Sequence, residues 1–126
     1  MDLVIQLGAN CRIHRIKQTT SFYVNVMGMK KEVFGKGRVA LRFEDQKINL
    51  HGLGKELEPK AHIPLPGSAD LCLLTPTPRN EAMAHVKNCG ADVLKGPVER
   101  TGATGPIRSF YIRDPDLNLI EVANKA

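Results

Sequence analysis

The sequence has few aromatic residues and no long apolar run. None of its 126 residues is tryptophan, and Phe, Tyr and Trp together make up 5%. No segment approaches the roughly 20 consecutive apolar residues of a membrane-spanning helix. The opening residues, MDLVIQLGANCR, have neither the basic n-region nor the apolar h-region of a secretory signal peptide. We therefore expect a cytoplasmic protein with no membrane partner.

Cysteine is also scarce. Cys11, Cys72 and Cys89 are widely separated and form no CxxC pair. Nothing in this spacing indicates a paired-cysteine zinc site or a thioredoxin-like redox motif. We expect all three cysteines to be reduced. We also expect Cys72 and Cys89 to be small core residues, because free cysteine is often buried.

Basic residues outnumber acidic ones, 18 against 13, for a formal net charge of +5. This charge favours anionic ligands in a general way. The glycines of FGKGRVAL do not open a helix, so there is no dinucleotide-binding motif. The basic residues are dispersed, and their densest group has no interleaved aromatic residues. We interpret that group as a solvated face and expect no nucleic-acid partner; it consists of Arg12, His14, Arg15 and Lys17.

The two halves of the sequence show the same succession of patterns. In the first half, Phe22, Val26 and Met29 recur at helical spacing. Two threonines can cap such a helix and Gly28 can end it, so we expect a helix near Thr19–Met27. Apolar or alternating runs then predict strands at 32–34, 39–43 and 48–51, followed by a connector rich in Gly, Pro, Lys and Glu.

The second half repeats this order. We expect a strand at 69–75 and then a helix near Pro78–Cys89, with Thr77 as its N-cap and Gly90 after its end. A short strand, a Gly-rich loop and two further strands complete the half, at 92–94, 97–106, 107–113 and 119–123.

Short segments of the two halves also match in sequence. Ile48-Asn49-Leu50 pairs with Ile120-Glu121-Val122, and the offset between such pairs grows only at loops. We therefore predict an internal duplication of a β-α-β-β-β module within one domain. The expected domain covers residues 1–126, with module one at about 1–53, a connector at about 54–67 and module two at about 68–126.

Strand alternation gathers polar residues on one face. Glu121 lies in the last predicted strand, and the duplication places Asn49 at the equivalent position. His51 shares a face with Asn49, and Asp70 opens the fifth strand on the same face as Cys72. We expect Asn49, His51, Asp70 and Glu121 to line one cleft between the two copies.

An inward carboxylate is costly unless it is paired or bound to a metal. Glu121 is therefore a candidate metal ligand or catalytic base. Its alternatives are an outward position on a half-exposed strand or a pairing with an arginine. For Asp70 and His51 the alternatives are a strand edge and a strand end at the surface.

Several motifs of the sequence resemble landmarks of the vicinal oxygen chelate superfamily, and among its members the glyoxalase-domain proteins. TTSFYVNVMGM resembles the Phe-Tyr and Gly-Met signature of the family's first helix. INLH, GSADLCLL, GPVERTGATGP and YIRDPDLNLIEV resemble its later landmarks, and the resemblance runs from about Thr19 to Val122. It implies an α+β fold in which paired βαβββ modules form an open eight-stranded cup, commonly in a homodimer.

The resemblance also implies a metal site. Metal-dependent members place one ligand each on the first, fourth, fifth and eighth strands. Glu121 matches the eighth-strand Glu, Asp70 falls at the fifth-strand ligand, and the fourth-strand ligand falls at Asn49 with His51 as a substitute. The first-strand His of the family falls at Gly8, so this chain lacks it.

Three functions follow from the resemblance. The leading one is a glyoxalase-I-like lyase or isomerase that acts on a small substrate with vicinal oxygens. It would use Zn, Ni, Mn or Fe held by His51, Asp70 and Glu121, with Glu121 as catalytic base and Asn49 and Arg100 as substrate-binding residues. The alternatives are a metal-free, antibiotic-sequestering type of binding protein and, ranked last, an extradiol-type dioxygenase.

Overall fold

The computed structural model describes residues 2–7, 12–52 and 58–126. The chain divides into two compact units. The first consists of Met1–Ala69 together with Pro115–Leu117, and the second of Asp70–Asp114 together with Asn118–Ala126. No helix within the described ranges is long and apolar enough to cross a membrane.

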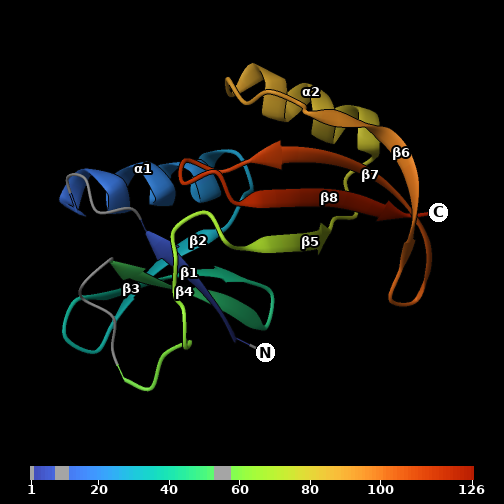
Figure 1. Ribbon diagram of the computed structural model, residues 1–126. Coiled ribbons are helices and arrows are strands. Elements are labelled where there is room, and N and C mark those ends of the chain that lie inside the picture. The colour runs from blue at the N-terminus through green and yellow to red at the C-terminus, as the bar shows by residue number, and fades with distance from the viewer. Residues whose placement is uncertain (1, 8–11, 53–57) are drawn as a thin grey trace. The chain divides into compact units, whose positions relative to one another are not determined.

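Each unit is a βαβββ module (Figure 1). The first contains β1 (Asp2–Leu7), α1 (Arg12–Asn25), β2 (Lys30–Phe34), β3 (Arg38–Phe43) and β4 (Gln46–Gly52). The second contains β5 (Asp70–Leu74), α2 (Arg79–Asn88), β6 (Lys95–Gly102), β7 (Gly105–Arg113) and β8 (Leu119–Lys125). The strand orders are β1-β4-β3-β2 and β5-β8-β7-β6, and in both sheets the first and last strands of the module pair in parallel. The predicted α+β class and the predicted modules are confirmed.

Each sheet buries one apolar face under its own helix. In the first unit Leu41 and Ile48 are fully buried, together with Tyr23 of α1. In the second unit the buried residues of the sheet alternate along the strands, and α2 adds Ala82 and Val86; the sheet residues are Phe110, Ile112, Ile120 and Val122. Because neighbours along a strand point to opposite faces, the polar residues between these positions lie on the face away from the helix.

The two ladders place Asn49 and Glu121 at equivalent positions. Each residue follows a fully buried isoleucine in an interior strand of its sheet. Asn49 lies opposite Ala40 of β3, and Glu121 lies opposite Tyr111 of β7. The register therefore agrees with the equivalence that the sequence predicts.

Helix α1 begins earlier than predicted. It starts at Arg12 rather than near Thr19, so the two threonines lie inside it and the prediction that they cap it is wrong. The added turns, RIHRIKQ, are mostly polar and show little apolar periodicity. The predicted stop is correct within two residues, because Gly28 adopts a φ of 73° and the Met29 N–H donates to the Tyr23 carbonyl at 3.0 Å.

Helix α2 agrees with the prediction to within one residue at each end. The N-cap is Pro78 and not the predicted Thr77, whose backbone N–H instead donates to Thr75 Oγ1 at 3.1 Å. After the helix, Gly90 has a φ of 88°, and the Ala91 N–H donates to the Val86 carbonyl at 3.0 Å. This is the Schellman arrangement that a C-terminal glycine allows.

The segment 97–106 was predicted to be a loop, and that prediction is wrong. It forms most of β6, the hairpin turn and the start of β7. Glycine and proline lower the strand propensity of the segment, but here Gly96 takes a φ of 128° beside a register shift between Lys95 and Val98. Residues 92–94, which the structure describes, form no strand, so the strand predicted there is wrong. Strand β6 begins at Lys95 instead.

The motif DPDLN forms the β7–β8 turn. The Asp114 carboxylate accepts hydrogen bonds from the Asn118 N–H at 2.9 Å and from Asn118 Nδ2 at 2.8 Å, and both residues are buried. Thr19 of α1 donates to Asp116 at 3.5 Å within the first unit. The motif thus forms a tight turn whose polar residues are satisfied internally.

Candidate functional site

Glu121 is a positioned carboxylate in the middle of β8. It lies on the sheet face away from α2, opposite Tyr111 of β7 and Cys72 of β5. The Ser109 hydroxyl donates to Glu121 Oε2 at 2.5 Å, and Ser109 is completely buried while Glu121 is half-buried. A hydroxyl bonded to an ionised carboxylate is a strong, short interaction. It offsets part of the cost of placing this charge in a strand.

Cys72 is the second partner of Glu121. Partial burial of the thiol raises the pKa of Cys72, although the residue as a whole is exposed, and the negative charge of Glu121, a hydrogen bond to Glu121 and the charge of Asp70 raise it further. Each of these influences favours the thiol over the thiolate. At neutral pH Cys72 is therefore a neutral thiol that donates a hydrogen bond to Glu121, and it is a poor nucleophile.

The prediction that Cys72 and Cys89 are core residues is wrong, because both are exposed. Cys72 lies on the polar face of β5 rather than on the face that packs under α2. Cys89 follows α2, and its sulfur lies 3.8 Å from His85 Nε2. Cys11 lies outside the described residues.

Arg100 and Tyr111 form a cation–aromatic pair on the same face as Glu121. Arg100 Nε donates to the Tyr111 hydroxyl at 3.2 Å, and the guanidinium carbon lies 5.9 Å from the ring centroid. Arg100 is exposed, and Tyr111 is half-buried. The predicted substrate-binding arginine thus lies beside the residue that pairs with Glu121 across the ladder.

The other predicted site residues are divided between the two units. Asp70 opens β5 and is exposed, on the same face as Cys72 and Glu121. Asn49 and His51 lie in β4 of the first unit, share a face and are half-buried. The structure thus brings Asn49 together with His51 and, separately, Asp70 together with Glu121. The convergence of all four residues on one cleft stays a prediction.

Asn49 carries an unsatisfied acceptor. Its Oδ1 atom is buried and accepts no hydrogen bond from the residues that the structure describes. An unmade hydrogen bond of this kind costs about 1–3 kcal/mol. A ligand N–H or O–H directed at Asn49 would recover that energy.

No group of three or more His, Cys, Asp or Glu side chains within the described ranges is arranged to hold a metal ion. Gly8 lies outside the described residues, and so does the side chain of His14. His62, in the connector, is exposed. The sequence analysis missed Ser109, although it alternates with the apolar Phe110 along β7 and so shares a face with Tyr111.

The sequence matches no family model, but two curated proteins are similar to it. A virulence protein of Salmonella typhimurium is 53% identical over 108 residues, which cover 86% of this chain and 75% of that protein. A glyoxalase domain-containing protein, RDO1 of Mycosarcoma maydis, is 51% identical over 111 residues. The chain belongs to the glyoxalase/bleomycin resistance/dioxygenase superfamily. The match covers 88% of this chain and 62% of the fungal protein, which is therefore the longer of the two.

Several solved structures share this fold. An integron cassette protein from the mobile metagenome of V. cholerae is 52% identical and gives a TM-score of 0.91, covering 99% of this chain and 93% of that one. At greater distance, the antibiotic-binding protein TnmS3 of Streptomyces gives 0.73 at 18% identity. A lactoylglutathione lyase of Agrobacterium tumefaciens gives 0.67 at 19% identity. At this level of identity, the likeness to these two proteins concerns the glyoxalase-like fold alone.

Proposed function

We propose that this superfamily member is a glyoxalase-I-like enzyme that moves a proton within a small substrate with vicinal oxygens. The observation that carries the proposal is the hydrogen bond from buried Ser109 to Glu121, which fixes a carboxylate on the polar face of the second sheet. A general base must be held within reach of the proton that it removes. Glu121 is the residue with the geometry of such a base.

The reaction that fits one positioned carboxylate is an isomerisation. Glu121 takes a proton from the hydroxyl-bearing carbon beside a carbonyl and returns it to the carbonyl carbon, while the hydroxyl proton passes to the other oxygen, so no atom is gained or lost. Ser109 holds Oε2, and the other carboxylate oxygen is the one that receives the proton. The Cys72 thiol, kept neutral by its raised pKa, adds no negative charge beside Glu121.

The predicted metal ligands belong to residue types that would hold a divalent metal. Two carboxylates and one imidazole, from Asp70, Glu121 and His51, are ligands that Zn, Mn, Fe and Ni accept. Whether as ligand or as base, Glu121 would act through the carboxylate oxygen that Ser109 does not hold. The metal supplies polarisation of the substrate oxygens when bound.

Asn49 and Arg100 are the proposed substrate-binding residues. The unpaired Asn49 Oδ1 accepts a hydrogen bond from the substrate. Arg100, aligned by Tyr111, binds an anionic or carbonyl oxygen on the Glu121 face.

A metal-free small-molecule binding protein is the second candidate function. The observation that favours it lies in β1, where Asp2–Leu7 read DLVIQL and supply no histidine for the first-strand ligand of metal-dependent relatives. The alignment of Arg100 on Tyr111 serves a bound ligand equally well without a reaction.

We also propose a homodimer as the assembled form. Val33 on β2, an edge strand of the first sheet, is 61% exposed. An edge strand carries unpaired backbone groups, and together with the exposed Val33 side chain these can pair with a second copy. Light scattering at high micromolar concentration is expected to give twice the mass of 13.9 kDa, and a monomer would refute the dimer.

Metal uptake tests the leading function. Protein purified without chelators is dialysed against Zn, Ni, Mn or Fe(II) and its metal content is measured. We expect about one equivalent in the wild type, none in Glu121→Ala and a sharp reduction in Glu121→Gln, because a cation prefers the charged oxygen. Glu99→Gln is the control, since Glu99 is exposed on the same sheet and pairs with Arg108 at 3.4 Å.

His51→Ala decides between the two fourth-strand residues. Loss of the metal in this variant identifies His51 as a ligand, and retention with loss in Asn49→Ala identifies Asn49 instead. If the wild type takes up none of the four metals, the enzyme proposal fails and the binding-protein proposal replaces it.

A further inference from the structure

The polar face of the first sheet is strongly basic. The residues on this face alternate with the buried residues under α1, and the ladder pairs them across β2, β3 and β4. Lys30 lies opposite Arg42, Arg42 lies opposite Lys47, and Phe34 lies opposite Arg38. The described side chains of this face thus include four cations, whereas Glu32 is the carboxylate among them.

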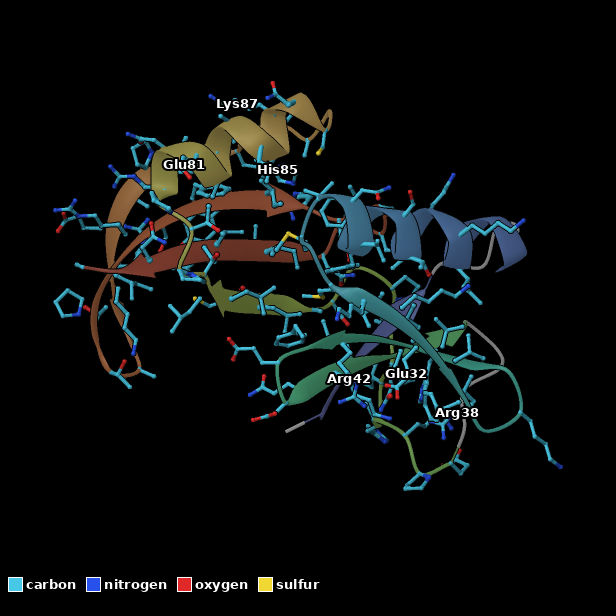
Figure 2. The ribbon with its side chains drawn as sticks, turned by 180° about the vertical axis from the view of Figure 1, so that it is seen from behind. Glu32, Arg38, Arg42, Glu81, His85 and Lys87 are labelled. Carbon is cyan, nitrogen blue, oxygen red and sulfur yellow. The ribbon has the colours of Figure 1, made fainter. Side chains whose placement is uncertain are left out.

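Glu32 is already used by one of these cations. Arg42 Nε and Nη2 bind its carboxylate at 3.2 Å and 2.9 Å, a two-point ion pair (Figure 2). Figure 2 also shows Arg38 on the same sheet near this pair. A carboxylate held at two points by one guanidinium has little capacity to neutralise a second cation.

Arg38 and Lys47 converge on one aromatic ring instead. The Arg38 guanidinium carbon lies 4.7 Å from the centroid of Phe34, and Lys47 Nζ lies 3.9 Å from it. Both cations are half-buried. No carboxylate in the described part of the chain forms an ion pair with either of them.

Among the side chains that the structure describes, this pair of cations has no neutralising carboxylate; the side chain of Asp2, which lies opposite Lys47 in the ladder, is outside that set. Two like charges that share one ring repel each other, and their partial burial strengthens the repulsion. The ring attracts each cation by roughly 0.5–2 kcal/mol without occupying its N–H donors. An anion that contacts both cations relieves the repulsion and satisfies those donors.

We propose that Arg38 and Lys47, held over Phe34, form a binding site for an oxyanion such as a carboxylate or a phosphate. Arg38 supplies a planar fork of donors and Lys47 a point charge, a combination suited to a group with two or more oxygens. The site lies on the face of Asn49 and His51, but its existence does not depend on the proposed enzyme activity or on a metal. It defines the ligand chemistry of the first sheet as anionic.

Binding of two simple probes, inorganic phosphate and succinate, tests the proposal by isothermal titration calorimetry at an ionic strength of about 0.15 M. We expect saturable one-to-one binding to the wild type and a loss of affinity of about tenfold or more in Arg38→Met and in Lys47→Met. One charge-assisted hydrogen bond contributes a factor of this size. Phosphate bound more tightly than succinate identifies a phosphate-type ligand, and the reverse order a carboxylate.

Lys31→Met is the matched control. Lys31 lies on the same strand as Phe34 but on the opposite face, and it is exposed. Its replacement lowers the net charge by the same amount as Arg38→Met or Lys47→Met. Its affinity should stay within about twofold of the wild type, because a general charge effect is small in screened solution. The proposal is overturned by absent saturable binding or by an equal loss in Lys31→Met. Thermal unfolding of each variant shows whether it folds. If a methionine variant does not fold, the binding of Lys47→Gln is measured in its place.

Discussion

The Ser109–Glu121 hydrogen bond provides a sharp test of how this site is built. Ser109→Ala removes a fully buried hydroxyl that lies 2.5 Å from a half-buried carboxylate. A hydrogen bond to a charged group contributes about 1.5–3 kcal/mol, and its loss also leaves the carboxylate with one fewer partner. The side chain shrinks by a single oxygen, so the cavity term is small. We expect the free energy of unfolding to fall by about 1.5–3 kcal/mol.

Urea denaturation at pH 7 measures this loss, and a double-mutant cycle isolates it. In a Glu121→Ala background the Ser109 hydroxyl has lost this acceptor, so Ser109→Ala is expected to cost nearly nothing or to stabilise the fold. Thr101→Ala, which removes an exposed hydroxyl from β6, should change stability by less than about 0.5 kcal/mol. Equal costs of Ser109→Ala in the two backgrounds would show that the hydrogen bond does not hold Glu121.

Two further predictions concern the same sheet. Because burial and Glu121 raise the pKa of Cys72, its alkylation by iodoacetamide at pH 8, followed by peptide mass spectrometry, should be slower in the folded than in the urea-unfolded chain and faster in Glu121→Gln. An unchanged alkylation rate in Glu121→Gln would refute this prediction. The folded state holds the Cys72 thiol proton more tightly than the unfolded chain does. The resulting contribution to folding stability is present below the ordinary pKa of 9.0 and is lost as the pH rises through the raised pKa. Gly96→Ala should destabilise the fold by about 3 kcal/mol or more in urea titrations, because its Cβ would lie 2.7 Å from Phe110 Cβ. Gly105→Ala, at a φ of 135° but with open space around it, should cost about 1–2 kcal/mol, and equal costs would contradict this.

The module plan was predictable from local signals. Strand alternation and the match of Ile48-Asn49-Leu50 with Ile120-Glu121-Val122 are properties of short segments, and they survive in both ladders. The position of Glu121 on the polar face followed from that alternation alone. Its equivalence with Asn49 needed only the repeat.

Other features depend on contacts that no local pattern encodes. The start of α1 was missed because RIHRIKQ offers no apolar stripe, and β6 was missed because its glycine and proline are tolerated only beside a register shift. Cys72 was predicted to be buried from the average behaviour of cysteine, whereas its own strand exposes it. Ser109 became visible only once the register had placed it diagonally from Glu121.

The same division applies to the basic face of the first sheet. The sequence shows Arg38 and Lys47 as two dispersed cations on either side of a hairpin. Their common contact with Phe34 requires the ladder of β2, β3 and β4 and the reach of two long side chains. The composition predicted a general preference for anionic ligands. The ladder brings together Arg38 and Lys47, the two cations of the proposed oxyanion site.

The most direct test of the account is an isomerase assay on the hemithioacetal of methylglyoxal and glutathione, followed by NMR in D₂O. The protein is loaded in turn with Zn, Ni, Mn and Fe(II). We expect metal-dependent turnover in the wild type and unchanged turnover in Glu99→Gln. In Glu121→Gln we expect a loss of at least about a hundredfold, which is the usual contribution of a general base. Equal turnover in Glu121→Gln and wild type would show that Glu121 is not the base. Absence of turnover with all four metals would contradict the glyoxalase-I-like proposal.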